Sequence, residues 1–247
     1  MKRIVREFQF TPAEEQRVRE LSRAVGITET TAGILFARGM DSEEKMRRFL
    51  APSKENLLSP FLMKGMKEAV LLLERAKKEE WRVAVFGDYD ADGIGAVSIL
   101  SRALKEYGIE PYLYVPERAE GYGLTTNAID RIFDEFLPDL IVTVDCGISN
   151  AAEVEYIKEQ GCYVIVTDHH ELPETLPDCI CINPKLKDDY PYDNLCGAGV
   201  AYKLSRALIG EKADDLLDFC ALSTVADSVP LLGENRDIVA AGLELIK

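Results

Sequence analysis

The stretch RVAVFGDYDADGIGAVSIL, residues 82–100, places three aspartates directly after a run of strand-forming residues. Asp88, Asp90 and Asp92 stand at alternate positions, and an apolar segment with helical spacing follows them. Valine and phenylalanine favour a strand, whereas the later apolar spacing favours a helix. The stretch therefore predicts a strand, a polar turn and a helix, which together make the first half of a βαβ unit.

The same alternation of short apolar strands and helical segments continues along the chain. The expected strands are RVAVF, PYLYV, LIVTV, CYVIV and CICI. The expected helices between them cover residues 93–107, 125–136 and 150–160, and two or more helices follow Cys196. Strands that alternate with helices favour parallel pairing in a sheet covered on both faces. The prediction is an α/β fold with an open, mostly parallel sheet and helices on both faces.

The part before the first strand is predicted to form a separate α-helical unit. FTPAEEQRVRELSRAVG has Thr11 as a helix start and Gly26 as its stop, and DSEEKMRRFL has Asp41 and Glu44 in capping-box spacing. A further amphipathic helix, MKEAVLLLERAKKEE, leads into the first strand. We therefore expect two parts, a helical unit over residues 1–80 and an α/β domain over residues 81–247.

Composition limits the class of protein. The chain has 247 residues, 47% of them hydrophobic and 29% charged, and no apolar run is long enough to cross a bilayer. Its start, MKRIVREFQF, lacks the apolar core of a signal peptide, so we expect a cytoplasmic protein without a membrane partner. The net charge of −14 argues against a surface that holds a polyanion by counterion release alone. Six cysteines without a C-x-x-C pair argue against a thiolate-bound zinc site.

Acidic and histidine side chains follow the ends of several expected strands. Asp145 follows LIVTV, the triplet Asp168, His169 and His170 comes after CYVIV, and Asp227 lies in a later helical stretch, ALSTVADSVPL. In open parallel sheets, ligands bind at the carboxyl ends of the strands. These groups and the three aspartates of the opening stretch are therefore expected to converge at one edge.

A cluster of this kind calls for divalent cations, because unpaired carboxylates in one pocket repel and raise each other's pKa. Oxygen and imidazole ligands suit Mn²⁺ or Mg²⁺, and Zn²⁺ less well. Several carboxylates, with one bridging, indicate two ions that activate water for attack on phosphorus and stabilise the leaving oxygen. The predicted chemistry is phosphoester hydrolysis.

Two other interpretations compete with the metal site. An aspartate after a strand is often a helix N-cap, and for Asp88 or Asp168 taken singly this role is as well supported as a functional one. Four strand or helix ends with such groups are harder to explain as caps. A dinucleotide-binding turn is excluded, because GDYDADGIGA lacks the G-x-G-x-x-G spacing and puts aspartates where a pyrophosphate would sit.

The segments DYDADG, VDCGIS, TDHH, GAGVA and TVADSVPL follow the order of the motifs of the DHH phosphoesterase superfamily, which this sequence resembles. VPERAEGYGL, LCGAGVAYKL and VADSVPLLGENR resemble the branch of bacterial single-stranded-DNA-specific exonucleases, and the likeness covers nearly the whole chain. It implies hydrolysis of single-stranded DNA from the 5′ end with two Mn²⁺ or Mg²⁺ ions, in DNA repair and recombination. It also implies a single-stranded-DNA-binding protein and a helicase as partners.

The resemblance further implies roles for individual residues. Five positions match the ligands of the two metal ions: Asp90, Asp92, Asp145, His169 and Asp227. Among them, Asp145 matches the bridging carboxylate. Asp88 and Asp168 match members of the same cluster, either as ligands or as groups behind them. His170 matches a group that faces the scissile phosphate and stabilises the charge that develops there, so Asp145, His169 and His170 are the expected catalytic residues.

Four other positions bear on the site. Arg118 resembles the phosphate-contacting arginine of the superfamily, with a solvated arginine as the alternative. Gly197 and Gly199 open a helix, and either let backbone N–H groups approach nucleic acid or allow close helix packing. Many members have histidine at the position of Phe86, where it adds a metal ligand, so we expect one ion to be bound more weakly in this chain.

The chain is shorter than members of this branch, and two functions other than exonuclease activity remain as alternatives. Members of this branch continue with a DHH-associated domain and an oligonucleotide-binding fold, whereas this sequence stops at Lys247 within a helical segment, so we expect a fragment. One alternative is a phosphodiesterase that uses the same metal centre on short oligonucleotides or cyclic dinucleotides. The other is a non-catalytic binding module of the same fold, and the complete set of aspartates and histidines argues against it.

Overall fold

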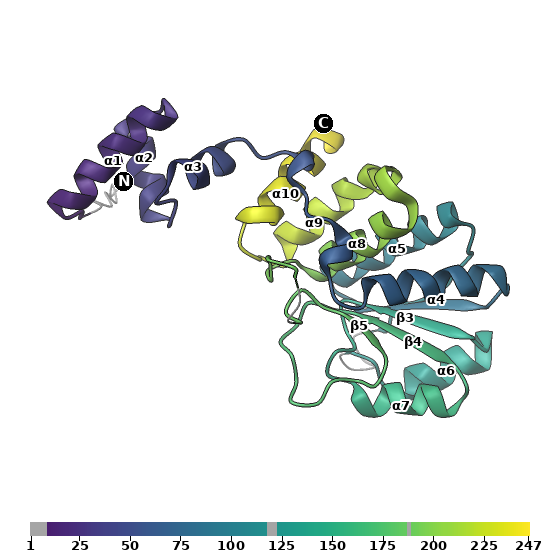
Figure 1. The fold of residues 1–247 in the computed structure, drawn as a ribbon. Helices are drawn as coiled ribbons and strands as arrows, with labels where there is room; N and C mark the ends of the chain where they lie inside the picture. The colour runs from purple at the N-terminus through teal and green to yellow at the C-terminus, as the bar shows by residue number, and fades with distance from the viewer. Residues whose placement is uncertain (1–8, 118–122, 187–188) are drawn as a thin grey trace, which may run out of the picture. The chain divides into compact units, whose positions relative to one another are not determined.

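The structure is a computed structural model that describes residues 9–117, 123–186 and 189–247 (Figure 1). The chain divides into two compact units, Met1–Pro52 and Ser53–Lys247. The first is purely helical where it is described, and the second contains all the strands of the described ranges. Every residue of the candidate metal centre belongs to the second unit.

The first unit contains α1 (Pro12–Val25), α2 (Glu29–Ala37) and α3 (Glu43–Leu50). Helix α1 begins and ends as predicted: Thr11 forms a capping box with Glu14, and Gly26 ends the helix in the left-handed conformation at φ 79°. The core of the unit is made of apolar side chains from all three helices, Val18, Leu21, Ala32, Leu35 and Met46.

The predicted start of α3 is wrong by one residue. Ser42, not Asp41, is the N-cap, because the Ser42 hydroxyl oxygen accepts a hydrogen bond from the backbone N–H of Lys45 at 3.2 Å. Asp41 instead accepts a hydrogen bond from Lys45 Nζ at 2.7 Å. Serine and aspartate are about equally favoured as N-caps, so their order in the sequence could not decide between them.

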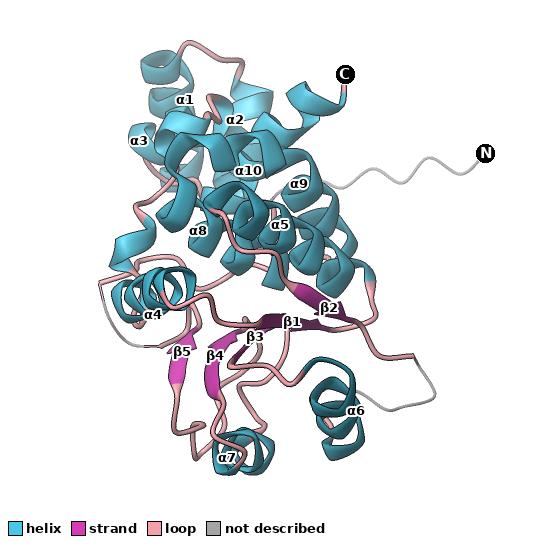
Figure 2. Ribbon diagram, turned by 90° about the vertical axis from the view of Figure 1, so that its right-hand side faces the viewer, coloured by secondary structure: helices cyan, strands magenta, loops and turns pink. Residues whose placement is uncertain are grey.

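The second unit is a five-stranded sheet with helices on both sides (Figure 2). The strands are β1 (Val83–Gly87), β2 (Tyr112–Tyr114), β3 (Leu140–Val144), β4 (Tyr163–Thr167) and β5 (Ile180–Ile182). The helices are α4 (Met66–Lys78), α5 (Ala91–Tyr107), α6 (Thr126–Phe136), α7 (Ala151–Glu159), α8 (Gly197–Ile209), α9 (Leu217–Ala226) and α10 (Gly233–Ile246), with 3₁₀ turns at Lys54–Asn56, Pro60–Leu62 and Gly210–Leu216. The predicted α/β alternation is confirmed, and its strands and helices lie where the sequence patterns indicate.

All strand pairings are parallel, and the strand order is β2-β1-β3-β4-β5. The register brings the last residues of the three central strands side by side, since Gly87 pairs with Val144 and Val144 pairs with Thr167. Thr167 in turn pairs with Ile182 at the end of β5. The residues that follow these four strands therefore start at the same level of the carboxyl edge.

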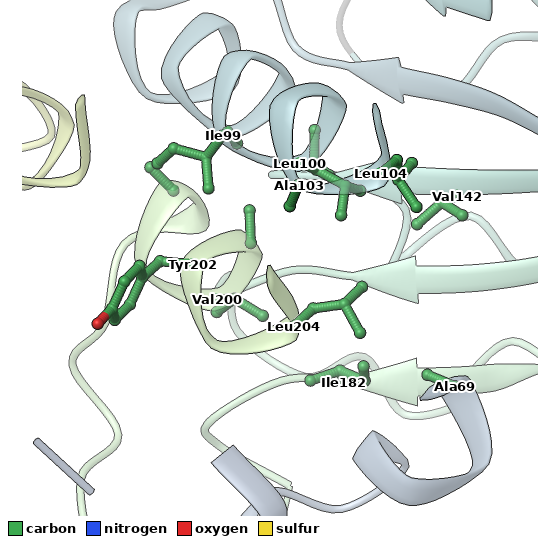
Figure 3. Close-up of a cluster of buried hydrophobic side chains, with 14 of the residues drawn as sticks. Ala69, Ile99, Leu100, Ala103, Leu104, Val142, Ile182, Val200, Tyr202 and Leu204 are labelled. Atoms are coloured by element: carbon green, nitrogen blue, oxygen red, sulfur yellow. The ribbon is translucent and has the colours of Figure 1, made fainter. Parts of the chain in front are cut away.

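Helices cover both faces of the sheet, as predicted. Figure 2 shows α6 and α7 on one side and α4, α5, α8, α9 and α10 on the other. On the second side, Leu100 and Leu104 of α5 and Val200 and Leu204 of α8 share one buried cluster with Val142 of β3 (Figure 3). The strands are apolar on both faces because each face meets a helical layer. Within the described ranges, no helix combines the length and apolarity needed to cross a bilayer.

The boundary between the units lies earlier in the chain than residue 80. Helix α4 buries Ala69 and Leu73 in the same cluster as Val83 and Val85 of β1, so it belongs with the sheet. Its amphipathic pattern predicted a buried face, but the pattern could not say which unit that face would contact.

Candidate metal centre

Three aspartates form a row along the carboxyl edge of the sheet. Asp88 follows β1, Asp145 follows β3 and Asp168 follows β4, and the aligned strand ends set them side by side. All three side chains are buried, with no residue more than 2% exposed. Asp145 also has a left-handed backbone at φ 60°, which a residue with a side chain adopts only at a cost in free energy. The row supplies the centre of the candidate site.

Asp90 is the N-cap of α5, a role that we had considered for Asp88. Its Oδ1 atom accepts hydrogen bonds from the backbone N–H groups of Asp92 and Gly93, both at 2.9 Å. Glycine is required at position 93, because a Cβ atom there would lie 2.4 Å from the carbonyl oxygen of Asp88. Asp90 therefore caps the helix, and it also belongs to a group of carboxylates that could hold a cation.

Asp92 joins the first turn of α5 to the start of α8. Its Oδ2 atom accepts a hydrogen bond from the backbone N–H of Gly197 at 2.6 Å, and Oδ1 accepts one from Ala198 at 3.0 Å. Amide groups at a helix N-terminus stabilise a carboxylate, and here they satisfy one that is only 2% exposed. His169 Nε2 lies 3.9 Å from Asp92 Oδ2, so Asp92 also borders the histidines.

Of the two roles expected for the glycines of GAGVA, close packing is the one that the geometry supports. A Cβ atom on Gly197 would lie 2.2 Å from Asp145 Oδ1, and one on Gly199 would lie 3.2 Å from the Leu195 side chain. The N–H of Gly197 already donates to Asp92, so the predicted contact of this amide with nucleic acid is not supported.

Asp168 holds both histidines of the triplet. Its Oδ1 accepts hydrogen bonds from the backbone N–H groups of His169 at 2.7 Å and His170 at 3.1 Å, and Oδ1 also lies 2.7 Å from His170 Nδ1. Its Oδ2 accepts a hydrogen bond from the Ile148 N–H at 2.9 Å. Burial alone would raise the pKa of Asp168, but the hydrogen bonds and the charge of His170 hold it below its ordinary value. In return, the hydrogen bond with Asp168 raises the pKa of His170.

His169 lies among the carboxylates of Asp92, Asp145 and Asp227, which come from three different segments. Its Nε2 is 3.2 Å from Asp145 Oδ1, and its Nδ1 is 3.9 Å from Asp227 Oδ2. Asp227 follows the last residue of α9, so a helix far along the chain brings this carboxylate to the strand ends. The histidine is therefore placed to coordinate a cation together with aspartates on either side of its ring.

Buried oxygens without hydrogen bonds mark the same place. Within the described ranges they include Asp88 Oδ2, Asp145 Oδ1 and Asp227 Oδ2. Burial raises the pKa of all three carboxyls, and the charges of Asp92 and Asp90 help to raise that of Asp145 to about 10. Buried carboxylate oxygens that lack a hydrogen bond are costly unless a cation compensates them.

Three sets of side chains could each place ligand atoms within 4.8 Å of one another. They are Asp88, Asp90 and Asp145; Asp92, His169 and Asp227; and Asp145, His169 and His170. Asp145 and His169 each belong to two sets, so the sets form one continuous site. Carboxylate oxygens and imidazole nitrogens without thiolates fit Mn²⁺ or Mg²⁺. The residues present therefore fit two neighbouring divalent cations.

Phe86 contributes no ligand atom to this site, as expected. Phe86 is fully buried, and its ring stacks on Tyr114 with the ring centroids 5.7 Å apart. It belongs to the cluster that also contains Ile129 and Ile132 of α6, and a phenyl ring offers no ligand atom. Arg118 lies outside the described residues.

Two residues in the turn after β5 contact the triplet and were missed by the sequence analysis. Asn183 Nδ2 donates to the carbonyl oxygen of His170 at 3.0 Å, and Lys185 Nζ donates to that of His169 at 2.6 Å. The rule applied to the other strand ends would have drawn attention to Asn183, because it directly follows β5.

Comparison with known proteins gives a consistent match. The profile of the DHH family, N-terminal domain, matches residues 82–224. The single-stranded-DNA-specific exonuclease RecJ of Bacillus subtilis is 40% identical over 237 residues, which cover 95% of this chain and 30% of that protein. The chain thus spans about 30% of the length of this curated relative.

Solved structures of similar proteins contain metal ions. The structure of RecJ from Thermus thermophilus in complex with Mn²⁺ matches with a TM-score of 0.77 and 33% identity, over 96% of this chain and 34% of that one. A structure of exonuclease RecJ bound to manganese matches with a TM-score of 0.69 and 38% identity, over 76% of this chain and 49% of that one. The α/β fold described above is shared with both.

Proposed function

The chain belongs to the DHH family, and from that premise we propose that it is the catalytic core of a metal-dependent exonuclease that removes nucleotides from the 5′ end of single-stranded DNA. Relatives at 40% identity are named as single-stranded-DNA-specific exonucleases. The observation that carries the proposal is the continuous set of carboxylates and imidazoles, in which Asp145 and His169 are each shared between two groups of ligand atoms.

The metal ions in this proposal are two Mn²⁺ or Mg²⁺ ions. The residues that would hold them are Asp90, Asp92, Asp145, His169 and Asp227, with Asp145 shared and Asp88 close enough to join. When bound, the ions supply the Lewis acidity that activates water for attack on phosphorus and stabilises the leaving oxygen.

The protein's own contribution is to orient the histidines and to place a donor at the phosphate. Asp168 engages His170 Nδ1, so a contact between His170 and a phosphate oxygen would be made by Nε2. The same contact raises the pKa of His170, because the neighbouring carboxylate favours the protonated form of the ring. A protonated imidazole is a hydrogen-bond donor suited to the negative charge that develops on the phosphoryl oxygens. Arg118 is proposed as a second phosphate contact.

The substrate and partners in this proposal are single-stranded DNA, a single-stranded-DNA-binding protein and a helicase, in repair and recombination in the cytoplasm. The net charge of −14 gives this chain little general attraction for DNA. The strand end would therefore have to be held by contacts close to the metal centre.

The experiment that tests the proposal is a product-length time course on a 5′-phosphorylated single-stranded DNA oligonucleotide labelled at its 3′ end. A ladder that shortens from the 5′ end with Mn²⁺, but not with chelator or with Asp145→Asn, is the expected result. Cleavage of only di- or trinucleotides or cyclic dinucleotides would favour the small-substrate phosphodiesterase. Mn²⁺ binding without any hydrolysis would favour the non-catalytic module.

A further inference from the structure

The backbone of the histidine pair is held from outside the sheet by the turn after β5. Asn183 Nδ2 donates to the His170 carbonyl oxygen at 3.0 Å, and Lys185 Nζ donates to the His169 carbonyl oxygen at 2.6 Å. Asn183 is only 1% exposed, and its Oδ1 accepts a hydrogen bond from the backbone N–H of Lys185 at 2.9 Å. The two donors therefore belong to one small, internally bonded turn.

The sheet itself does not hold these two residues. The Asp168 N–H donates to the Ile182 carbonyl oxygen at 3.0 Å, one step beyond the β4–β5 ladder, and His169 and His170 lie in irregular backbone after it. Their N–H groups are bound by the Asp168 carboxylate, and their carbonyl groups by Asn183 and Lys185. All four backbone polar groups of the pair are thus engaged by side chains.

We propose that Asn183 and Lys185 are positioning residues that fix the backbone of His169 and His170, so that both rings face the metal centre before a cation binds. The inference rests on the proposed function, because it assigns to that metal centre two residues of its support. A change in either donor would let the carbonyl groups rotate, and both rings would move with them. Groups behind the ligands that orient them typically change metal affinity 10–100-fold when removed.

The charge of Lys185 and its role as a donor predict opposite changes in cation affinity when the residue is replaced. Its other partner, Glu171, is a solvent-exposed carboxylate at 3.0 Å, and such a pair contributes little. Removal of a positive charge near a cation site would by electrostatics alone tighten cation binding. Removal of a donor that positions the histidines would weaken it. Lys185→Met therefore separates the two effects by the sign of the change.

The experiment is a calorimetric titration of the whole chain with Mn²⁺, together with thermal unfolding of the metal-free protein. The variants are Asn183→Ala, Lys185→Met and Lys185→Arg, which keeps a charged donor. Lys158→Met is the matched control: Lys158 on α7 is similarly exposed, at 31% against 26% for the Lys185 side chain, and it pairs with Glu155 and Asp178 instead.

The expected result is Mn²⁺ binding 10–100-fold weaker in Asn183→Ala and Lys185→Met, with Lys185→Arg and Lys158→Met close to the parent chain. If Asn183→Ala does not fold, Lys185→Met decides. Equal or tighter Mn²⁺ binding by folded Lys185→Met would overturn the positioning role while leaving the proposed function intact. Absence of Mn²⁺ binding by the parent chain would overturn the proposed function and this inference with it.

Discussion

The Oδ2 atom of Asp92 lies 2.6 Å from the backbone nitrogen of Gly197, so a carboxylate in the first turn of α5 accepts a hydrogen bond from the N-terminus of α8. The same approach brings the Gly197 Cα so close to Asp145 that a Cβ atom would lie 2.2 Å from its Oδ1. Helix α8 is therefore held at the candidate metal centre by two hydrogen bonds to Asp92 and by the close approach that the lack of a side chain at Gly197 allows.

Gly197→Ala is expected to push α8 away from Asp145 and to distort the site. The extra methyl group should destabilise the protein by about 1–3 kcal/mol, as overpacking does in a tight interior. The loss of exonuclease activity should be larger than the loss of folded protein explains, since Asp92 would lose its amide partners. Gly199→Ala is the matched control, because the atoms nearest to its Cβ would belong to the Leu195 side chain, at 3.2 Å. Urea unfolding and the exonuclease assay measure stability and activity in both variants. Equal losses in Gly197→Ala and Gly199→Ala would contradict the packing argument.

Asp145→Asn is expected to abolish turnover and, without divalent cations, to stabilise the fold. The pKa of Asp145 is raised to about 10, mainly by burial, whereas the ordinary value is 3.8. Between these values the folded state binds a proton that the unfolded state has released, so stability falls as pH rises through this window. The asparagine variant lacks that slope and should be more stable at pH 8 by about 1–3 kcal/mol.

Urea unfolding at pH 5 and pH 8 in the presence of chelator measures this difference. The control is Asp134→Asn on α6, an exposed position that should leave the pH slope of the parent chain unchanged. The same slope in Asp145→Asn and in the parent would show that Asp145 is not protonated in the metal-free protein.

Asp168→Asn is expected to lower the pKa of His170. The hydrogen bond between Oδ1 and His170 Nδ1, and the charge of the carboxylate, hold the His170 pKa above its ordinary value of 6.5. The neutral amide removes the charge, so the His170 pKa should shift downward. Because the chain has only two histidines, NMR titration of their ring protons can follow both. An unchanged His170 pKa in the variant would mean that Asp168 does not tune this ring.

Addition of Mn²⁺ is expected to stabilise the folded chain, because only the folded state assembles the ligand groups. At a concentration 100 times the dissociation constant, binding contributes about 2.7 kcal/mol, which raises the Tm by about 5–10 °C for a protein of this size. Asp227→Asn should reduce this shift and Asp134→Asn should not. Differential scanning calorimetry with Mn²⁺ and with chelator gives the comparison, and a Tm that does not respond to Mn²⁺ would argue against the metal centre.

Much of the α/β unit could be predicted from local pattern. The apolar strands at Val83–Gly87 and Leu140–Val144, and the helices after them, follow from runs of β-branched residues and from helical spacing. The convergence of Asp88, Asp145 and Asp168 also followed, because residues after parallel strands meet at one edge. Local pattern was weaker at the N-cap of α3, where Asp41 and Ser42 are about equally favoured. It was also weaker at the unit boundary, where it could not say which unit the buried face of α4 contacts.

The hydrogen-bond partners of the carboxylates in the cluster could not be predicted from the sequence. Asp92, Asp145 and Asp168 are all aspartates that follow or lie near a strand end, so the sequence does not distinguish them. In the structure, backbone amides of α8 bind Asp92, and the two histidines bind Asp168. The place of Asn183 after β5 could be predicted, but its role could not, because that role depends on the carbonyl group of His170 in a different strand–turn segment.

The sequence by itself determined which residues end each strand, and hence the kind of atoms, oxygen and imidazole nitrogen, that gather at the carboxyl edge. Strand and helix propensity act over a few neighbouring residues, so that information is local. Only the tertiary structure decided which of those atoms remain without a hydrogen bond. That depends on the approach of α8 and α9 and on the turn after β5, because a buried carboxylate is satisfied by whatever donors the packing of distant segments brings within about 3 Å.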